Sequence, residues 1–234
     1  MSKILDNLTL VIPAKNEQEA LPLFLEELDD YKVKILIVIS KNDIVTYEKI
    51  KKKKNIEILF QEHEGYGSAI IEAINKVQTN YMTIINADGS MNPTYLYQML
   101  QKCLNNDFVF ASRYESDNSG SEDDTWLTFV GNKIFSLIGN ILFKLNLGDI
   151  LFTYILGKTK SFKKLNLKYK DFRLCVEIPI KAKKMKMNYS SIPNYERKRV
   201  AGIKKVNEFK DGFLILLGIL SLIGKKYTSH DKEK

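Results

Sequence analysis

The chain has 234 residues, 44% of them hydrophobic, which suffices for one sizeable core and fits a single domain with appendages better than two small globules. Its formal net charge of +8 is unevenly distributed: residues 1–120 carry 13 Lys and Arg against 17 Asp and Glu, and residues 121–234 carry 23 against 11. The basic second half points to a polyanionic partner, either nucleic acid, an anionic membrane surface or a phosphorylated substrate. A solubilising lysine surface is the alternative, and it fits less well for the cluster at 197–199 and 204–205.

Two features bear on the compartment. Cys103 and Cys175 belong to no CxxC pair, which argues against a zinc site or a disulfide framework and fits a reducing cytosol. The first ten residues lack the apolar stretch of a secretory signal. We therefore expect a cytoplasmic protein.

Apolar runs alternate with helical patterns along the first half of the chain. The runs predict strands at 8–13, 33–39, 56–61, 81–87 and 107–112. Between them the spacing predicts helices at 16–31, 44–53, 68–78 and 94–104, the first capped by Asn16 with Glu19 completing a capping box. This alternation is typical of an α/β fold with a mostly parallel sheet flanked by helices.

Two apolar segments follow in the basic half, at 126–149 and 212–224. The first is interrupted by Asn and Lys and the second is short, so neither fits the roughly 20 residues of a spanning helix. Both suit amphipathic helices lying at a membrane interface, and ordinary helices covering the sheet remain an equal alternative for 126–149. A membrane or partner contact fits 212–224 better, and a disordered tail is expected beyond it.

Polar residues gather just after the predicted strands, where parallel sheets bind ligands. After the third strand, Gly65 and Gly67 would let the backbone approach a ligand or would simply make a tight turn. After the fourth, Asp88 could cap the helix that Pro93 opens. Capping leaves the polar Asn86 inside an apolar run unexplained. The acidic stretch 117–124 is a hypothetical lid.

Seven motifs in order carry a resemblance to a known family. They are IPAKNE (12–17), GYGSA (65–69), NADGS (86–90), ASRY (111–114), GD (148–149), VEIPIKA (176–182) and RVAGIKK (199–205). The series, which covers about residues 8–210, resembles family 2 glycosyltransferases of the dolichyl-phosphate mannose synthase type. The resemblance implies a GT-A fold in residues 1–210, followed by a C-terminal amphipathic helix and tail in residues 211–234. It also implies a divalent metal, Mg²⁺ or Mn²⁺, a nucleotide-diphosphate sugar, and inverting transfer to a polyprenyl phosphate or glycan acceptor at a membrane face.

The resemblance also implies residue roles. The metal would lie on Asp88, Asn86 and Ser90. The nucleotide sugar would contact the turns that carry Pro13, Ala14, Glu17, Gly65, Gly67 and Ala69, together with Asn86. The catalytic group would comprise Arg113 and Asp149 near the reacting centre, with Arg199 and Lys205 closing over the phosphates.

The implied chemistry explains these residue types. Cleaving a sugar–diphosphate bond leaves charge on the diphosphate, which a hard cation and fixed positive groups stabilise. A phosphate acceptor is already nucleophilic near neutral pH because its second pKa is near 6. A hydroxyl acceptor instead requires a base, for which Asp149 is the first candidate and Glu177 the second.

Two positions depart from the family pattern. Ser40 and Lys41 stand where two acids would hold the nucleotide, which leaves the nucleotide open. Asn86 replaces the first aspartate of the metal motif, although a neutral oxygen can still ligate Mg²⁺ or Mn²⁺. The alternatives are therefore a catalytically degenerate nucleotide-sugar-binding protein and a basic membrane-associated adaptor. We expect a peripheral protein on the cytoplasmic face of an anionic membrane, with no nucleic-acid partner.

Overall fold

The computed structural model describes residues 5–203, 205–225 and 227. The strands are β1 (Leu8–Ala14), β2 (Lys34–Ser40), β3 (Ile56–Gln61), β4 (Tyr81–Ile84), β5 (Phe108–Ser112), β6 (Gly120–Ser121), β7 (Ile155–Lys158), β8 (Tyr189–Pro193) and β9 (Tyr195–Glu196). The helices are α2 (Ala20–Leu28), α3 (Ile44–Ile50), α4 (Tyr66–Lys76), α5 (Leu96–Cys103), α6 (Trp126–Phe143), α7 (Thr159–Leu165), α8 (Leu174–Lys184) and α9 (Glu208–Ser221), with 3₁₀ turns η1 (Asp29–Tyr31) and η2 (Pro93–Tyr95).

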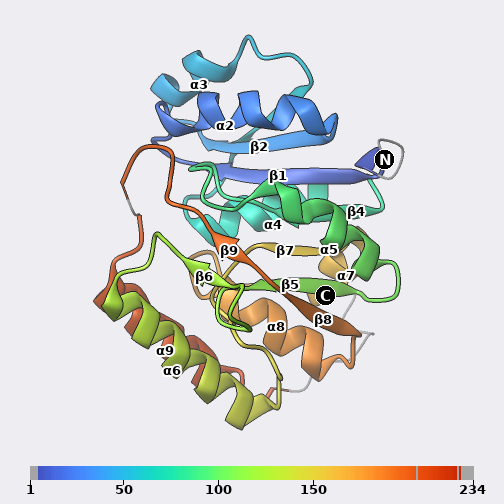
Figure 1. The fold of residues 1–234 in the computed structure, drawn as a ribbon, viewed down its shortest axis with the longest axis vertical. Helices are drawn as coiled ribbons and strands as arrows, with labels where there is room; N and C mark the ends of the chain where they lie inside the picture. Colours follow the sequence, from blue (N-terminus) through green and yellow to red (C-terminus); the bar gives the residue numbers. More distant parts are fainter. Residues whose placement is uncertain (1–4, 204, 226, 228–234) are drawn as a thin grey trace.

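A seven-stranded sheet in the order β3-β2-β1-β4-β7-β5-β8 forms the centre of the molecule (Figure 1). β7 runs antiparallel to both of its neighbours, whereas the other pairings of this sheet are parallel. A small second sheet joins β6 to β9. The predicted α/β class with a mostly parallel sheet is therefore confirmed.

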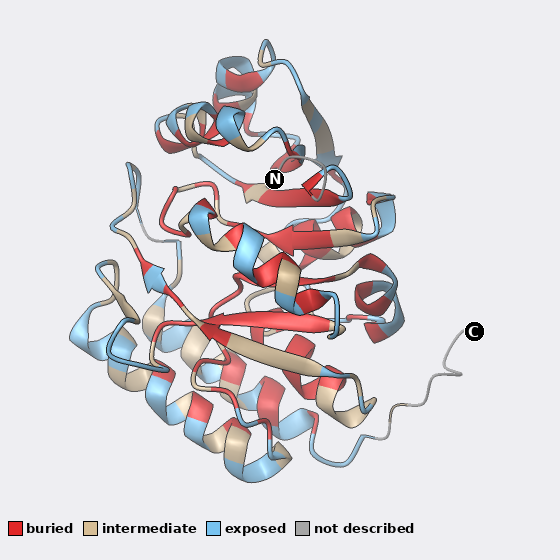
Figure 2. Ribbon diagram, turned by 45° about the vertical axis from the view of Figure 1, so that its right-hand side comes forward, coloured by how far each residue is buried: buried red, intermediate tan, exposed pale blue. Residues whose placement is uncertain are grey.

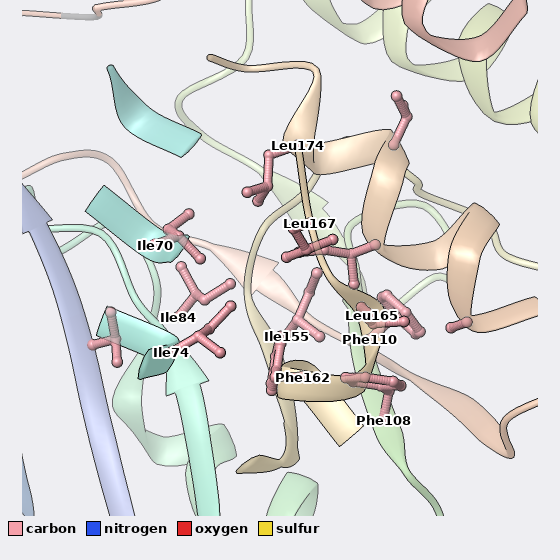
Figure 3. Close-up of a cluster of buried hydrophobic side chains, with 14 of the residues drawn as sticks. Ile70, Ile74, Ile84, Phe108, Phe110, Ile155, Phe162, Leu165, Leu167 and Leu174 are labelled. Carbon is pink, nitrogen blue, oxygen red and sulfur yellow. The ribbon is translucent and has the colours of Figure 1, made fainter. Parts of the chain in front are cut away.

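The central strands of the sheet are buried on both faces, as continuous apolar strands require, whereas β3 and β8 at its edges are only partly buried. Side chains of β1 alternate between two cores: Leu10 and Ile12 face the cluster under α2 and α5, and Val11 faces the opposite one. Figure 3 shows the second cluster, in which Ile70 of α4 and Phe162 of α7 meet the strands. Figure 2 shows the same distribution: the central strands are buried, and the outward faces of the helices are exposed.

Two local predictions are wrong, and the strands that follow β5 were not predicted. Asn16 does not cap a helix: its φ is 54°, and α2 begins only at Ala20, without a side-chain cap. The fourth strand ends at Ile84 rather than at 87, so Asp88 lies in a turn beyond the strand. β7, a short strand with no alternating pattern, was not anticipated. Pro93, by contrast, opens η2 as expected.

The two apolar segments form α6 and α9, which pack against each other and against α8 at one end of the sheet (Figure 1). α9 begins at Glu208, slightly before the predicted boundary, and its Ile215 and Ile219 join the buried cluster under α8. The predicted tail spans residues 227–234, of which 228–234 lie outside the described residues, as does Lys204.

Candidate active site

The candidate site lies beyond the carboxyl ends of β1 and β4, where β2 pairs with one side of β1 and β4 with the other. The chain order reverses at this point, and open α/β sheets bind their ligands in the crevice that results. The turn carrying Asp88 follows β4, and the turn carrying Glu17 follows β1.

Asp88 is held in a tight turn. The Ser90 N–H donates to Oδ1 of Asp88 at 3.1 Å, and the Val200 N–H donates to its backbone carbonyl at 2.8 Å. Gly89 adopts φ 73°, and a Cβ there would lie 2.7 Å from Cγ2 of Val200. The turn therefore requires glycine, and it presents Oδ2 of Asp88 toward Nη1 of Arg199 at 3.7 Å.

Asn86 lies two residues before Asp88 and is oriented by Tyr66. The Tyr66 hydroxyl donates to Oδ1 of Asn86 at 3.4 Å and shares a 2.6 Å hydrogen bond with Thr153. Burial raises the pKa of Tyr66, which keeps the phenol neutral, and its ring stacks on Phe172 at 5.0 Å. Asn86 is thus a neutral amide held in a fixed orientation beside Asp88.

The position of the Ser90 side chain differs from that expected of a metal ligand. Its side chain is buried, and its hydroxyl donates toward Oε1 of Glu196 at 3.5 Å. Among the described residues, no group of three or more Asp, Glu, His or Cys side chains has a metal-binding arrangement. The donor set that fits a divalent cation is therefore sparse: one carboxylate, the neutral oxygen of Asn86 and the phosphates of a substrate, which is the pattern that Mg²⁺ accepts.

Residues 197–203 and 205, which we call the strap, cross this turn. Arg199 forms a bidentate pair with Asp123 at 2.9 and 2.5 Å, so its guanidinium bridges Asp123 and Asp88. Lys205 lies 3.5 Å from Oε1 of Glu17 and donates to the carbonyl of Asn16 at 3.2 Å. The predicted phosphate-binding cations therefore do gather around Asp88 and Glu17.

The first turn is arranged around Glu17. Burial raises the pKa of Glu17, and Lys205 opposes that shift. Pro13 and Ala14 form the end of β1 just before it. The N–H groups of Asn16 and Glu17 donate to Asp43 at 2.6 Å and to Thr46 at 2.9 Å. The turn is thus fixed by the following β2–α3 connection.

That connection also contains Ser40 and Lys41, the two residues that stand in place of the expected acids. Ser40 is buried and donates to Glu64 at 3.0 Å, whereas Lys41 is exposed. The next acidic residue along the chain is Asp43, which caps α3 by accepting a hydrogen bond from the Thr46 N–H. Sequence reasoning missed Asp43, although an Asp just before an apolar helix is a recognisable N-cap signal.

The glycine turn packs against the protein itself. A Cβ on Gly65 would lie 2.2 Å from the carbonyl of Lys170, and one on Gly67 would lie 2.2 Å from that of Tyr169. Ala69 is buried in the core. The close approach that the glycines permit is to residues 169–171, which favours the tight-turn interpretation; a ligand contact at these positions stays a prediction.

Arg113 lies in a buried cluster of carboxylates. Its guanidinium donates to Asp149 at 2.7 and 3.3 Å and to Glu196 at 3.1 Å, and Asp124 lies 3.4 Å away. The ring of Phe152 covers it at 4.5 Å. Burial alone would lower the pKa of Arg113, but Asp149 and Glu196 outweigh it, so the guanidinium stays charged.

The two candidate bases are both engaged. Asp149 has a side chain that is 0% exposed, and it accepts hydrogen bonds from Arg113 and from the N–H groups of Leu151 and Phe152. Glu177 is buried in α8, where it pairs with Lys181 at 2.7 Å and accepts from the backbone of residues 168–169. Neither carboxylate is presented to a ligand in this conformation, so each fits an anchoring role better than that of a base.

A pocket of about 580 Å³ opens above Arg113. Tyr114, Trp126, Phe129 and Lys133 also line it, so it leads from the buried cluster to the beginning of α6. Its lining also includes Glu115, Asp117 and Asp124, so charges of both signs and aromatic side chains surround the space.

Glu196, which the sequence analysis did not single out, links Arg113 to the β6–β9 sheet through a 2.6 Å hydrogen bond from Ser121. Burial raises its pKa above the ordinary 4.5, and Arg113 opposes this shift. The stability that Glu196 contributes is therefore greatest below about pH 4.5 and is lost as the pH rises through its native pKa. Replacing Glu196 by Gln is expected to flatten the pH dependence of the unfolding free energy. Guanidinium titrations between about pH 4 and pH 8 measure this, and equal slopes for both proteins would contradict it.

The family follows from a comparison of the sequence with protein-family models. The model described as glycosyl transferase family 2 matches residues 9–166, which is more than half of the chain. The chain belongs to this family. The matched part includes the turns of Glu17 and Asp88 and the Arg113–Asp149 pair, and it ends before the strap.

Curated relatives are similar over a shorter stretch. An uncharacterized glycosyltransferase of Mycobacterium tuberculosis is 30% identical over 88 residues, which is 37% of this chain and 39% of the relative. A second, from Mycobacterium bovis, aligns to the same extent. The alignment thus spans well under half of the curated relatives.

Solved structures share the fold. Glucosyl-3-phosphoglycerate synthase from M. tuberculosis, in complex with Mn²⁺, UDP-glucose and phosphoglyceric acid, matches with a TM-score of 0.73 at 13% identity, over 95% of this chain and 81% of that one. Mannosyl-3-phosphoglycerate synthase from Rubrobacter xylanophilus matches with a TM-score of 0.64 at 14% identity, over 92% and 72%. At these identities the likeness concerns the fold, and it confirms the GT-A architecture. The dolichyl-phosphate mannose synthase type stays a prediction.

Proposed function

We propose that this protein transfers a sugar, with inversion, from a nucleotide-diphosphate sugar to a polyprenyl phosphate, with a divalent metal at Asp88. The observation that carries the proposal is the meeting of Asp88, Arg199 and Lys205 at the ends of β1 and β4 in a family 2 fold. The Mn²⁺ and UDP-glucose bound by the structural neighbour support the choice of donor.

Each group has a role in cleaving the donor. A divalent metal, when bound at Asp88 and Asn86, stabilises the charge that develops on the leaving diphosphate. Arg199 and Lys205 supply fixed positive charge next to it, and Tyr66 keeps the Asn86 amide in place. Glu17 and Asp43 shape the turn against which the nucleotide lies.

The engaged state of the carboxylates favours a phosphate acceptor over a sugar hydroxyl. A hydroxyl requires a base within hydrogen-bond reach, and both Asp149 and Glu177 are buried and paired. A phosphate monoester brings an oxygen that is already ionised near neutral pH. Arg113 and Lys133 are the cations that line the pocket, and a phosphate bound there would compete with the carboxylates that pair with Arg113. The acceptor then supplies the nucleophile and the protein positions it.

The distribution of residues on α6 supports a lipid acceptor. The buried residues of this helix are Asn132, Ser136 and Gly139. Many of its large apolar side chains are exposed, whereas Phe135 and Ile138 pack, partly buried, against the core. Trp126 is 78% exposed and Ile141 is 68% exposed. A water-facing helix has the opposite pattern, so the outer face of α6 is built to contact an apolar phase.

α9 continues this surface beside α6. Phe209, at 80% exposure, and Phe213 are among its exposed apolar side chains. We propose that α6 and α9 rest in the acyl boundary of an anionic leaflet, with nearby lysines contributing about 1 kcal/mol each at the headgroups. The protein would then be peripheral on the cytoplasmic face.

By length and composition α6 could also cross a membrane, since its 18 residues have a mean hydropathy of 1.3 and 22% of that stretch is buried. This differs from the prediction that the Asn and Lys residues within the segment make it unfit to span. Its contacts with α8 and α9 argue instead for a helix that rests against the domain. The buried side of α6 carries Asn132, Ser136 and Gly139, which are the small and polar residues that a close helix contact needs.

Replacing Leu137 and Ile141 together by Glu is expected to reduce binding to vesicles of anionic phospholipid by at least tenfold, because two charges enter the apolar surface. The unfolding free energy should change by no more than about 0.5 kcal/mol, since both side chains are exposed. Co-sedimentation with vesicles measures the binding. The matched control is Leu23→Glu with Leu104→Glu, two exposed leucines elsewhere. Equal loss in both variants would contradict a specific membrane face.

Transfer of radiolabelled sugar tests the acceptor. Purified protein would be incubated with Mn²⁺ and a panel of nucleotide-diphosphate sugars, and with polyprenyl phosphate in vesicles, 3-phosphoglycerate or an oligosaccharide. Label in the lipid phase alone supports the proposal. Label on phosphoglycerate or the oligosaccharide would replace the acceptor, and donor binding without transfer would favour a nucleotide-sugar sensor. Vesicle binding without donor binding would favour a membrane adaptor.

A further inference from the structure

The strap's cations pair with carboxylates at the place where a metal and a donor would bind. Arg199 bridges Asp88 and Asp123, and Lys205 lies beside Glu17. Three site carboxylates are thus accompanied by two protein cations. The protein's own side chains already fill much of the demand for positive charge at this end of the sheet.

The strap is placed there by contacts that do not involve those two cations. The Arg197 N–H donates to the carbonyl of Ser90 at 2.9 Å, and the Val200 N–H donates to that of Asp88 at 2.8 Å. The Arg197 side chain forms a bidentate pair with Glu27 at 2.9 and 3.0 Å. The backbone and Arg197 therefore hold Arg199 near Asp88 without relying on the ion pairs of Arg199 and Lys205.

Asp123 belongs to the acidic stretch considered above as a lid. That stretch is tied to the strap through the β6–β9 pairing, in which Gly120 and Ser121 lie opposite Tyr195 and Glu196. The guanidinium of Arg199 thus has one partner, Asp88, in the turn after β4 and a closer, bidentate partner, Asp123, in the acidic stretch. Asp123 is placed to hold Arg199 beside the site.

A divalent cation and a diphosphate would affect this arrangement in opposite ways. A metal at Asp88 would be repelled by the guanidinium 3.7 Å from Oδ2, so the two compete for one carboxylate. A diphosphate would attract Arg199 and Lys205, because phosphate oxygens are strong partners for both side chains. Metal and donor would therefore bind poorly one at a time and well together.

We propose, on the basis of the donor function proposed above, that donor binding is a cation exchange: the diphosphate takes Arg199 and Lys205 from the carboxylates, and the metal takes Asp88. Asp123 is the positioning residue that holds Arg199 in the metal-free state. No bond is formed or broken in this step; only the partners of the charged groups change.

Replacing Arg199 by Gln tests the exchange, because the variant should shift two affinities in opposite directions. Mn²⁺ alone, followed by electron paramagnetic resonance of the free ion, is expected to bind about tenfold more tightly. A nucleoside diphosphate with Mn²⁺, followed by calorimetry, is expected to bind at least tenfold more weakly. Lys205→Gln should show the same opposite shifts more weakly.

The matched control is Lys198→Gln, which removes an exposed charge from the same strap. It is expected to change neither affinity, and circular dichroism with an unfolding midpoint checks that each variant is folded. Unchanged or weaker Mn²⁺ binding in Arg199→Gln would overturn the exchange, as would an equal effect of Lys198→Gln. The Mn²⁺ measurement needs no nucleotide, so a shift there without any nucleotide binding would leave the competition at Asp88 standing while the proposed donor function fails.

Discussion

Replacing Asp88 by Asn is expected to lower kcat/KM for sugar transfer by about 10²–10³-fold and to abolish metal-dependent donor binding. The amide has the shape of the carboxylate and can still accept the Ser90 N–H, so the turn should remain folded. What is lost is the single negative charge that the sparse donor set offers to the metal. Steady-state kinetics and a calorimetric titration with Mn²⁺ and the donor measure both effects.

The control for this variant is Asp30→Asn, which removes an exposed carboxylate from η1, after α2. It should leave kcat/KM within a factor of about two, in keeping with a surface substitution. A variant at Asp88 that retains full metal-dependent activity would place the metal elsewhere. The converse change, Asn86→Asp, should strengthen Mn²⁺ binding by restoring a second carboxylate.

Replacing Arg113 by Met is expected to cost about 3–5 kcal/mol of unfolding free energy, because it leaves Asp149, Glu196 and Asp124 buried around an uncharged side chain. The loss should shrink as the pH falls and Glu196, whose pKa is raised by burial, becomes protonated. Guanidinium unfolding at two pH values measures both effects.

The matched control is Arg173→Met, which breaks a partly exposed bidentate pair with Asp171. That change should cost about 1 kcal/mol or less, because an ion pair near the surface is screened by water. Similar losses in the two variants would mean that the cluster around Arg113 is far better hydrated than its burial indicates. A large loss for Arg113 alone supports its role as the anchor beneath the pocket.

Local patterns predicted the strands that carry the site. β1, β2, β3 and β5 coincide closely with apolar runs, because a buried parallel strand must be apolar on both faces. The rule that ligands bind beyond strand ends correctly brought together the turns of Glu17 and Asp88. The short β7 escaped because its burial is set by two neighbouring strands rather than by its own pattern.

The remainder of the site depends on contacts between distant residues. Glu196 meets Arg113 across 83 positions of sequence and Ser90 across 106, so no local signal could have marked it. Asn16 looked like a helix cap, but its own N–H donates to Asp43, the Glu17 N–H donates to Thr46, and its backbone is left-handed. The pair of Arg113 and Asp149 likewise became visible only in the fold, whereas Glu177 and Lys181 stand four residues apart, a spacing that the sequence does show.

The central claim is that a metal-dependent nucleotide-sugar site lies at the Asp88 turn. The most direct test is a calorimetric titration of the purified protein with a panel of nucleotide-diphosphate sugars, with and without Mn²⁺, alongside Asp88→Asn. We predict that one donor binds only with the metal and that the substitution removes this binding. Binding that is indifferent to both the metal and Asp88, or absent for every donor, would contradict the account.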